Sequence, residues 1–379
     1  MKYISMIPPL AAGGVFRGRP DGARPAIDAG TLPFRYGRDA LRVGLDLFGI
    51  GAGDEVLVPA VICEVVLDAF SERDVRLGYY GLSDSLAVDV DEIEARIGAE
   101  TRAVYVNHAL GRPVQMKPLR ALCSRRGVVL IEDCAHALGG ASNGDQLGTL
   151  ADFAIFSYRK FFALPDGGGL RVQQTARRTP LVFSRVALQR QVTGAGKLCA
   201  LGLAASLGLP SAVWRSRSKL RASTEADMDD GDQPSADVPY RMSALSEWLL
   251  SRADMKAMVA RRRQNFAYCL DKVRSLASVE PLFKELSSGQ VPYSFPVLVD
   301  DRDSIVRRAA AEAILLEPTF APVDRRRKGL INPEERFDSL DAIAGKLLSI
   351  PVHQGLSPDA LDRVFDVVRR GLTDRGACD

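Results

Sequence analysis

The first half of the sequence alternates between short apolar runs and longer segments whose apolar residues recur at helical spacing. The run "VVLIED" at residues 128–133 is typical, because its apolar residues follow one another without the polar alternation of a strand exposed on one face. Strands that are buried on both faces have this pattern, and the helical segments between them favour parallel connections. The pattern predicts an α/β fold with a mostly parallel central sheet and helices on both of its faces.

Four polar residues lie at or directly after the ends of these predicted strands. They are His108, Asp133, His136 and Ser157. The functional groups of parallel α/β sheets gather beyond the carboxyl ends of the strands. We therefore expect these four residues to meet at one edge of the sheet.

Asp133 ends the run "VVLIED", where its carboxylate should be buried. A buried carboxylate is costly unless it meets a cation. The protonated ring nitrogen of pyridoxal phosphate would be such a cation, because an aspartate partner keeps the ring of this cofactor an electron sink. An ion pair with an arginine is the structural alternative. The adjacent Glu132 should point to the opposite face of the sheet.

The stretch "FAIFSYRKFFALPDGGGLRV" at residues 153–172 places an isolated lysine, Lys160, between two predicted strands. Its neighbours are Arg159, Phe161 and Phe162. Desolvation and a neighbouring positive charge both disfavour a charged ammonium group. A lysine in this setting is a usable amine nucleophile and can form a Schiff base with an aldehyde cofactor. An ordinary surface lysine on a loop is the alternative.

The first predicted helix begins at Gly37, Arg38 and Asp39. The amides and the dipole of a helix start favour an anion, and Gly37 permits its close approach. Arg38 can add a charge-assisted hydrogen bond. With Ser157 available for a phosphate oxygen, these residues are candidates for binding the phosphate group of the cofactor.

Four segments resemble, in their order and spacing, the DegT/DnrJ/StrS-type sugar aminotransferases, which are fold-type I enzymes that use pyridoxal phosphate. The resemblance covers residues 32–172 well, 240–275 moderately and the last predicted helix well. It implies a large cofactor-binding α/β domain and a smaller C-terminal α/β domain. The segments are "YGRDALRVGLDLFGIGAGDEVLVPA", "NHALGRPVQMKPLRALCSRRGVVLIEDCAHALGG", "LGTLADFAIFSYRKFFALPDGGGL" and "PVHQGLSPDALDRV".

The resemblance also implies roles for single residues. Asp133 corresponds to the aspartate that holds the pyridine nitrogen, and His136 to the residue near the phenolic oxygen of the ring. Ser157 corresponds to the serine that contacts the phosphate, and Lys160 to the lysine that carries the cofactor. The amides of the helix start correspond to further phosphate ligands. Cys63 stands where the family has an aromatic residue stacked on the ring.

The reaction that the resemblance implies is reversible transamination. An amino acid donor, usually glutamate in the family, would transfer its amino group to a keto group, most often that of a nucleotide-linked sugar. The resemblance further implies a homodimer with active sites at the subunit interface. Two alternative functions remain. The acceptor could be a carbonyl compound other than a sugar, or the protein could be a non-catalytic member of this fold that acts as a regulator or partner-binding subunit. Members of the family that catalyse eliminations have usually lost the lysine, so the presence of Lys160 disfavours an elimination reaction.

Two domains are predicted. The large cofactor-binding domain comprises residues 1–245, and the small C-terminal α/β domain comprises residues 246–379. Residues 175–239 lie outside the resemblance and form a divergent insert that ends in an acidic loop. The aspartates of this loop do not have the spacing of an EF-hand calcium site.

Charge and cysteine content exclude several functional classes. A net charge of +3 over 379 residues is too small to favour nucleic acid or an anionic membrane. The six cysteines are scattered without a C-x-x-C pair, which is typical of reduced thiols in a cytoplasmic protein and not of a disulfide framework or a zinc site. The apolar segment at 198–214 is shorter than a membrane span and is interrupted by glycines and a proline. Membrane association through this segment is disfavoured but stays open.

Other patterns have a weaker basis. "SYRK" at 157–160 matches the S-x-x-K of penicillin-recognising serine enzymes, but no "SDN" or "KTG" follows it. "GIGAGD" at 49–54 imitates a dinucleotide fingerprint, but it precedes a predicted strand instead of following one. His108 is a candidate to line the cofactor site, and a satisfied histidine at a strand end is the alternative. His353 is predicted to be a cap or packing residue.

Overall fold

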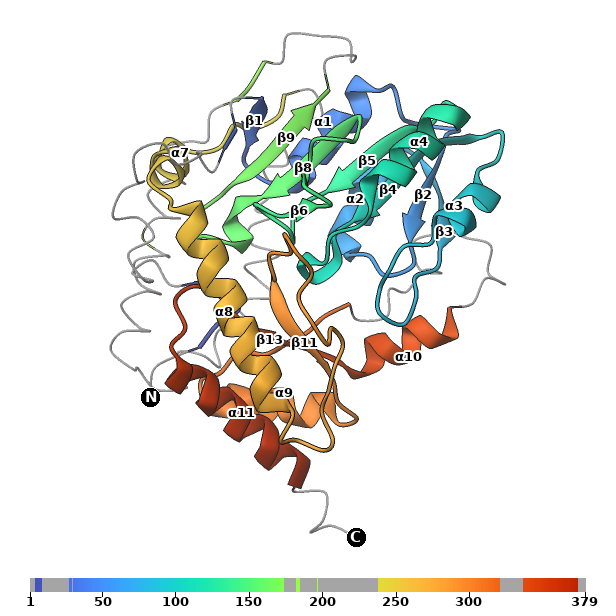
Figure 1. Cartoon of the computed structure of the whole chain (residues 1–379). Helices are drawn as coiled ribbons and strands as arrows, with labels where there is room; N and C mark the ends of the chain where they lie inside the picture. Colours follow the sequence, from blue (N-terminus) through green and yellow to red (C-terminus); the bar gives the residue numbers. More distant parts are fainter. Residues whose placement is uncertain are drawn as a thin grey trace.

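In the computed structural model the chain forms a large, mostly parallel sheet with helices packed against it, and a smaller antiparallel sheet formed by its C-terminal part (Figure 1). The predicted apolar segment at 198–214 lies outside the described residues, and so does most of the predicted insert at 175–239. None of the described helices combines the length and the apolar composition that a membrane crossing requires. The structure describes residues 4–8, 27–28, 30–173, 182–184, 196, 238–320 and 337–373.

The large sheet has seven strands, and their order places the ends of β5 and β8 side by side. The pairs β2–β3, β2–β4, β4–β5 and β5–β8 are parallel, whereas β8–β9 and β9–β1 are antiparallel. The predicted mostly parallel central sheet is therefore confirmed. From edge to edge the order is β1 (Thr31–Phe34), β9 (Gly168–Val172), β8 (Phe153–Ser157), β5 (Val129–Asp133), β4 (Thr101–Asn107), β2 (Glu55–Pro59) and β3 (Arg76–Tyr80).

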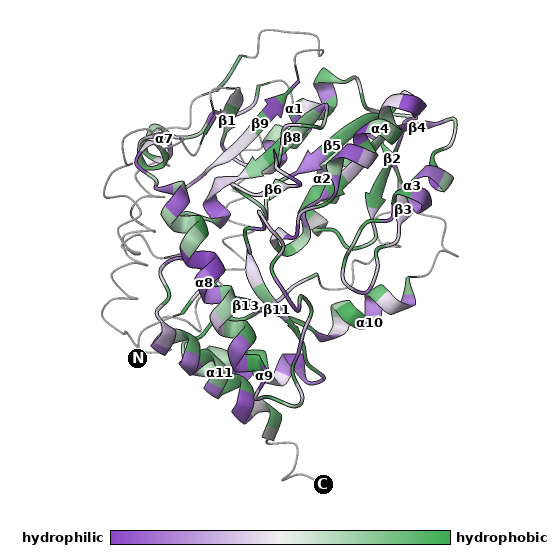
Figure 2. Cartoon of the chain, viewed as in Figure 1, coloured by the Kyte–Doolittle hydropathy of each residue, from purple (hydrophilic) through white to green (hydrophobic). Residues whose placement is uncertain are grey.

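The central strands are buried on both faces. Every residue of β5 and β8 is buried, which explains why these stretches of sequence are apolar without alternation. In Figure 2 the central strands are coloured largely as hydrophobic, whereas the helices around them carry both colours. The polar exceptions in β5 and β8 are Glu132, Asp133 and Ser157. Such buried polar groups require hydrogen-bond partners inside the protein or from a ligand.

Four of the described helices lie against the large sheet. Helix α1 (Gly37–Leu47) packs on β8 and β9, and α4 (Met116–Arg126) packs on β5. Helices α2 (Glu64–Ser71) and α3 (Val90–Arg96) pack on β3. Gly44 makes the close approach of α1 possible, because a Cβ atom at this position would lie 2.4 Å from the ring of the first residue of β8.

Short elements follow the ends of the central strands. A 3₁₀ turn, η1 (Ala109–Gly111), follows β4, and a second one, η2 (Tyr158–Lys160), follows β8 directly. A hairpin of β6 (Ala141–Ser142) and β7 (Asp145–Gln146) lies between β5 and β8 in the chain. Lys160 is therefore held in a turn at the carboxyl end of β8.

The C-terminal part contains a four-stranded antiparallel sheet with helices beside it. Its order is β10 (Glu280–Pro281), β11 (Ser294–Leu298), β13 (Leu347–Pro351) and β12 (Glu317–Pro318). Helices α8 and α11 pack against each other, and both show hydrophilic and hydrophobic colours in Figure 2, as amphipathic helices do. The helices of this part are α7 (Ala244–Ser251), α8 (Met255–Val273), α9 (Arg302–Ala311), α10 (Asp338–Lys346) and α11 (Pro358–Thr373). The predicted boundary between residues 245 and 246 falls inside α7, and the division into domains at that point stays a prediction.

The connection into β11 holds the small sheet against the strand ends of the large one. The N–H of Tyr293 donates a hydrogen bond of 3.1 Å to the carbonyl oxygen of Leu110 in η1. Gly111 permits this approach, because its φ is +89° and a Cβ atom there would lie 2.2 Å from the carbonyl oxygen of Val291. Residues of the small sheet's connection thereby reach the edge where β4, β5 and β8 end.

Candidate active site

Asp133 is the last residue of β5, and only 8% of it is exposed. The hydroxyl of Tyr105, on the neighbouring β4, donates a hydrogen bond to its Oδ2 atom. The N–H of Ala135 donates a second hydrogen bond, of 2.7 Å, to Oδ1. Within the part of the chain that the structure describes, no arginine, lysine or histidine forms an ion pair with Asp133. The alternative of an arginine partner is therefore not found there.

Tyr105 is a site residue that the sequence analysis did not single out. Its side chain is fully buried in β4. Burial, the charge of Asp133 and the nearby Cys63 raise the pKa of Tyr105, so the hydroxyl stays protonated and donates to the carboxylate. Cys63 directly precedes α2 and its side chain is exposed. Cys63, which stands where the resemblance places a ring-stacking aromatic residue, therefore interacts electrostatically with Tyr105.

Lys160 and His136 meet between the ends of β5 and β8. The Nζ atom of Lys160 lies 2.9 Å from Nε2 of His136. Burial and the charge of Lys160 lower the pKa of His136 well below its usual value of 6.5. The imidazole is therefore neutral at physiological pH, and its Nε2 atom accepts a hydrogen bond from the lysine.

The ring of Tyr293 fixes the orientation of His136. The two rings are stacked with centroids 4.3 Å apart and an interplanar angle of 9°. Tyr293 belongs to the connection into β11, so this contact links the small sheet to the lysine through His136. The sequence carries no local signal for it, because the two rings lie more than 150 positions apart in the chain.

The start of α1 lies against the end of β8, as a phosphate site built from both would require. A Cβ atom on Gly37 would lie 3.0 Å from the carbonyl oxygen of Phe156 and 3.9 Å from Cβ of Ser157. Ser157 is buried, with only 7% of the residue exposed. The side chain of Asp39 is engaged otherwise, because it accepts hydrogen bonds from the N–H of Tyr36 and from Arg42. Only the backbone of Asp39 is left for the predicted anion-binding role.

The imidazole of His108 is bonded away from this group of residues. Its Nδ1 atom accepts a 3.0 Å hydrogen bond from the N–H of Val114, and its Nε2 atom lies 2.9 Å from Oε1 of Glu132. Glu132 also accepts a 2.7 Å hydrogen bond from the N–H of Gly148. Because adjacent strand residues point to opposite faces, Glu132 draws the His108 imidazole to the face of β5 opposite Asp133. These contacts fit the predicted alternative of a satisfied histidine at a strand end.

His108, Glu132 and Cys134 also bring three potential metal-binding atoms within 4.8 Å of one another, and all three residues are buried. Because Nδ1 accepts a hydrogen bond from a backbone amide, the proton of the neutral imidazole is on Nε2. The Nε2–H group then donates a hydrogen bond to the Glu132 carboxylate. Cys134 makes a longer contact of 3.7 Å to the same oxygen. The group is thus a hydrogen-bonded network around the Glu132 carboxylate, and it joins β4 to β5.

Arg262 of α8 holds the turn that carries Lys160. Its fully buried guanidinium lies 4.4 Å from the ring centroid of Phe161 and donates hydrogen bonds of 3.1 Å to Gln354 and to the carbonyl oxygen of Tyr293. Gln354 in turn donates a 2.7 Å hydrogen bond to the carbonyl oxygen of Phe161. Burial lowers the pKa of Arg262 from 12.5 to about 9, which leaves it cationic at neutral pH.

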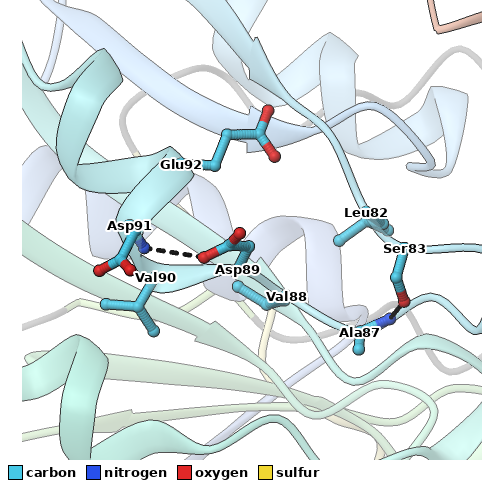
Figure 3. A pocket seen from close by; sticks show the side chains of 8 residues that line it. All are labelled: Leu82, Ser83, Ala87, Val88, Asp89, Val90, Asp91 and Glu92. Carbon is cyan, nitrogen blue, oxygen red and sulfur yellow. Dashed lines mark hydrogen bonds between the residues drawn. The ribbon is translucent and has the colours of Figure 1, made fainter.

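A surface pocket elsewhere on the molecule does not belong to this site. It lies between β3 and the start of α3 and is lined by Leu82, Ser83 and residues 87–92 (Figure 3). Asp89 caps α3 there by accepting a 2.9 Å hydrogen bond from the N–H of Asp91. In the order of the sheet, β3 lies three strands from β5. The pocket is therefore remote from Asp133.

The chain matches a known family over most of its length. The sequence profile of the DegT/DnrJ/EryC1/StrS aminotransferase family matches residues 32–179 and 238–369. Among solved structures, the aminotransferase TlmJ from Streptoalloteichus hindustanus is 21% identical and superimposes with a TM-score of 0.69, covering 98% of this chain and 99% of that chain. This likeness confirms the predicted fold-type I architecture.

Curated relatives agree with the family match. The dTDP-3-amino-3,4,6-trideoxy-alpha-D-glucose transaminase of Micromonospora megalomicea subsp. nigra is 26% identical over 89% of this chain and 84% of its own length. The GDP-perosamine synthase of Vibrio cholerae is 36% identical, but the alignment covers only 35% of this chain and 36% of that protein. The chain therefore belongs to the DegT/DnrJ/EryC1/StrS aminotransferase family, whose members use pyridoxal phosphate.

Proposed function

We propose that the protein transfers an amino group from an amino acid donor, glutamate, to the keto group of a nucleotide-linked sugar, with pyridoxal phosphate bound at Lys160. The observation that carries this proposal is the grouping of Lys160, His136 and Asp133 at the adjacent ends of β5 and β8. Two relatives named as acting in dTDP-sugar and GDP-sugar chemistry support the choice of acceptor.

The residues fit the cofactor at both of its ends. Asp133 is a buried carboxylate that receives hydrogen bonds from Tyr105 and Ala135, and the described residues offer it no cation. A pyridinium nitrogen would supply that cation. At the other end, Ser157 and the adjacent start of α1 at Gly37 fit a phosphate group.

When bound, the cofactor would supply an electron sink that makes the α-proton of the amino donor easier to remove. Lys160 would bind the cofactor covalently in the resting enzyme and, once released by the donor, would move protons at the reacting carbon. His136, kept neutral by burial, orients the Nζ atom through the 2.9 Å hydrogen bond. Asp133, held by two donors, would stabilise the protonated ring nitrogen.

We also propose a homodimer with active sites at the subunit interface and a cytoplasmic location. The homodimer rests on the resemblance described above. The location rests on cysteine usage, since Cys63, Cys123, Cys134 and Cys269 are all free thiols in the described residues. The sedimentation behaviour of the purified protein tests the assembly.

Covalent trapping tests the proposal directly. Purified protein is incubated with pyridoxal phosphate and reduced with borohydride, and the modified lysine is located by mass spectrometry. We expect modification at Lys160, a visible absorption band before reduction, and loss of that band when glutamate is added. Lys160→Ala should abolish the band, whereas Lys117→Ala should keep it, because Lys117 is an exposed lysine paired with Asp145. Modification at another lysine, or none at all, would contradict the proposal.

Amino transfer to the acceptor is a separate test. The aminated form of the cofactor-loaded protein is mixed with a panel of keto-sugar nucleotides, and return of the visible band reports transfer. We expect transfer to at least one member of the panel. Bleaching by glutamate without transfer to any sugar nucleotide would favour a non-sugar carbonyl acceptor. Binding of the cofactor without bleaching by any amino acid would favour a non-catalytic role.

A further inference from the structure

Two aromatic rings lie beside the imidazole of His136, and the small sheet carries both of them. The ring of Tyr293 is stacked on the imidazole, as described above, and the ring centroid of Phe320 lies 6.3 Å from it at an interplanar angle of 54°. Tyr293 directly precedes β11, and Phe320 follows the end of β12 by two positions. Because the Nζ atom of Lys160 is hydrogen-bonded to the same imidazole, Phe320 belongs to the surroundings of the amine.

A row of hydroxyl groups ties together the two chain segments that carry these rings. Oγ1 of Thr319 donates a 2.6 Å hydrogen bond to Oγ of Ser349 on β13, and that atom lies 2.9 Å from Oγ of Ser294 at the start of β11. Ser294 directly follows Tyr293, and Thr319 directly precedes Phe320. Ser294 and Ser349 are fully buried. The end of β12 is therefore fixed to the two neighbouring strands, and this fixes the chain at Phe320.

The backbone of Phe320 has a left-handed conformation, with a φ of +54°. This conformation is unfavourable for a bulky side chain, and it persists where the surrounding structure imposes it, often at ligand sites. The residue is only half-buried, although an aromatic ring gains stability from full burial. A strained backbone that holds a partly exposed ring beside a reactive amine points to a ligand that covers the ring.

We propose that Phe320 is a specificity-determining residue for the amino acceptor, because its ring packs against the ring of a cyclic keto acceptor and favours it over open-chain acceptors. This inference rests on the proposed function. The acceptor ring in question is the one that carries the keto group, since its reacting carbon has to reach the site of the Lys160 amine. The C–H face of a saturated ring can cover an aromatic side chain, whereas a short keto acid offers little apolar surface. Apolar contacts of this kind discriminate roughly 10–200-fold for each methylene group.

The test compares a cyclic and an open-chain acceptor on the same protein. The aminated form of the cofactor-loaded protein is mixed with the keto-sugar nucleotide that it aminates or with 2-oxoglutarate, and return of the visible band gives the rate of each transfer. Phe320→Ala should slow transfer to the keto-sugar nucleotide roughly tenfold or more. Transfer to 2-oxoglutarate should stay within about twofold, because Lys160, His136 and Asp133 are unchanged. Equal slowing of both transfers would mean a general supporting role and would overturn the inference.

Two further variants serve as controls. Phe320→Tyr keeps the aromatic ring and should retain transfer to the keto-sugar nucleotide within about threefold. Phe48→Ala removes another half-buried ring, which lies 5.3 Å from the ring of Phe153 at the end of α1. This second control should leave the ratio of the two rates unchanged. If Phe320→Ala leaves that ratio unchanged as well, the inference is wrong.

Equilibrium binding separates this inference from the proposed function. The melting temperature of the cofactor-loaded protein is measured with a panel of keto-sugar nucleotides and with the corresponding nucleoside diphosphates. At least one sugar nucleotide should give the larger rise, and Phe320→Ala should lose this excess but keep the rise with the nucleoside diphosphate. If the excess depends on Phe320 while no amino transfer occurs, the ring contact stands and the proposed function fails. An excess that Phe320→Ala keeps, a lost response to the nucleoside diphosphate, or no excess in the unmodified protein would overturn the inference.

Discussion

Replacing Tyr105 with phenylalanine tests whether its hydroxyl holds an ionised Asp133 in place. The side chain is fully buried, and its ring packs edge-on against Phe70 with centroids 5.8 Å apart. Phenylalanine preserves this packing and removes a single oxygen. The hydrogen bond to Oδ2 of Asp133 is therefore the main interaction that the substitution deletes.

The expected loss of stability in Tyr105→Phe depends on the charge of the hydrogen-bond acceptor, the carboxylate of Asp133. A hydrogen bond to a charged group contributes about 1.5–3 kcal/mol to stability, and one between neutral groups about 0.5–1.5 kcal/mol. Tyr80→Phe is the matched control, because Tyr80 is equally buried and its hydroxyl donates a 2.9 Å hydrogen bond to a neutral acceptor, the carbonyl oxygen of Tyr105. We expect Tyr105→Phe to lower the free energy of unfolding by roughly 1–2 kcal/mol more than Tyr80→Phe does.

Urea denaturation at neutral pH measures the loss of unfolding free energy in each variant, provided that this free energy depends on the urea concentration with the same slope in the unmodified protein and in both variants. A double-mutant cycle with Asp133→Asn then isolates the interaction energy between Tyr105 and Asp133, which should be on the order of 1–2 kcal/mol. Pyridoxal phosphate should bind more weakly to Tyr105→Phe than to Tyr80→Phe, because the carboxylate has lost one of its two donors. Equal losses of stability in the two variants, with no coupling in the cycle, would refute this view of Asp133.

Two further predictions concern a buried arginine, Arg262, and a buried histidine, His353, which lie beside the small sheet. Arg262→Met should reduce the fraction of protein that pyridoxal phosphate and borohydride modify at Lys160, because the turn loses its contacts with Arg262. Arg263→Met is the control, since among the described residues Arg263 binds the carbonyl oxygens of Ser287 and Gln290 and not the turn. Equal modification in both variants would contradict this role of Arg262. Burial, and to a smaller extent the charge of Arg262, lower the pKa of His353 from 6.5 to about 3. As the pH falls below 6.5, this histidine therefore binds a proton in the unfolded chain but stays unprotonated in the folded protein. Stability should therefore fall by about 2 kcal/mol between pH 6.5 and about pH 5 from this residue alone, and His353→Gln should lack that part of the acid loss in urea denaturation at the two pH values.

The positions of Asp133 and Lys160 could be predicted because they depend on local signals. The run that ends at Asp133 is apolar on both faces, and all five residues of β5 are indeed buried. Parallel strands bring their carboxyl ends to one edge, so residues at the ends of β5 and β8 have to meet. Lys160 follows Ser157 by three positions, and the 3₁₀ turn η2 comprises those three residues.

His108 shows where the strand-end argument is insufficient. A position at the end of a strand places a residue at an edge of the sheet but does not determine on which face its side chain finds a partner. Glu132 needs a donor inside the protein, and His108 supplies it at 2.9 Å. A buried carboxylate in a strand therefore predicts a buried donor on the neighbouring strand, and that rule would have assigned His108 to Glu132.

Contacts made by the small sheet could not be predicted from local patterns. Tyr293 and Gln354 lie in connections, where neither the period of a helix nor that of a strand says which side chains face inward. Arg262 did carry a signal. It follows Met258 by four positions and precedes Phe266 by four, so it lies on the buried stripe of α8 in spite of its charge. An arginine on such a stripe predicts an interior role.

The buried charge of Arg262 explains why the lysine turn and the small sheet must come together. The lowering of its pKa to about 9 means that burial disfavours the cation by about 5 kcal/mol, and one of its nitrogens, Nη2, has no partner among the described residues. The contacts that offset this cost come from the ring of Phe161, the side chain of Gln354 and the carbonyl oxygens of Pro292 and Tyr293. The turn after Lys160 and both connections of the small sheet therefore all contribute contacts that stabilise the buried arginine. Tyr293, whose carbonyl oxygen accepts one of these hydrogen bonds, also stacks on His136, so the contacts of Arg262 and the alignment of the Lys160 amine with His136 depend on the same connection of the small sheet.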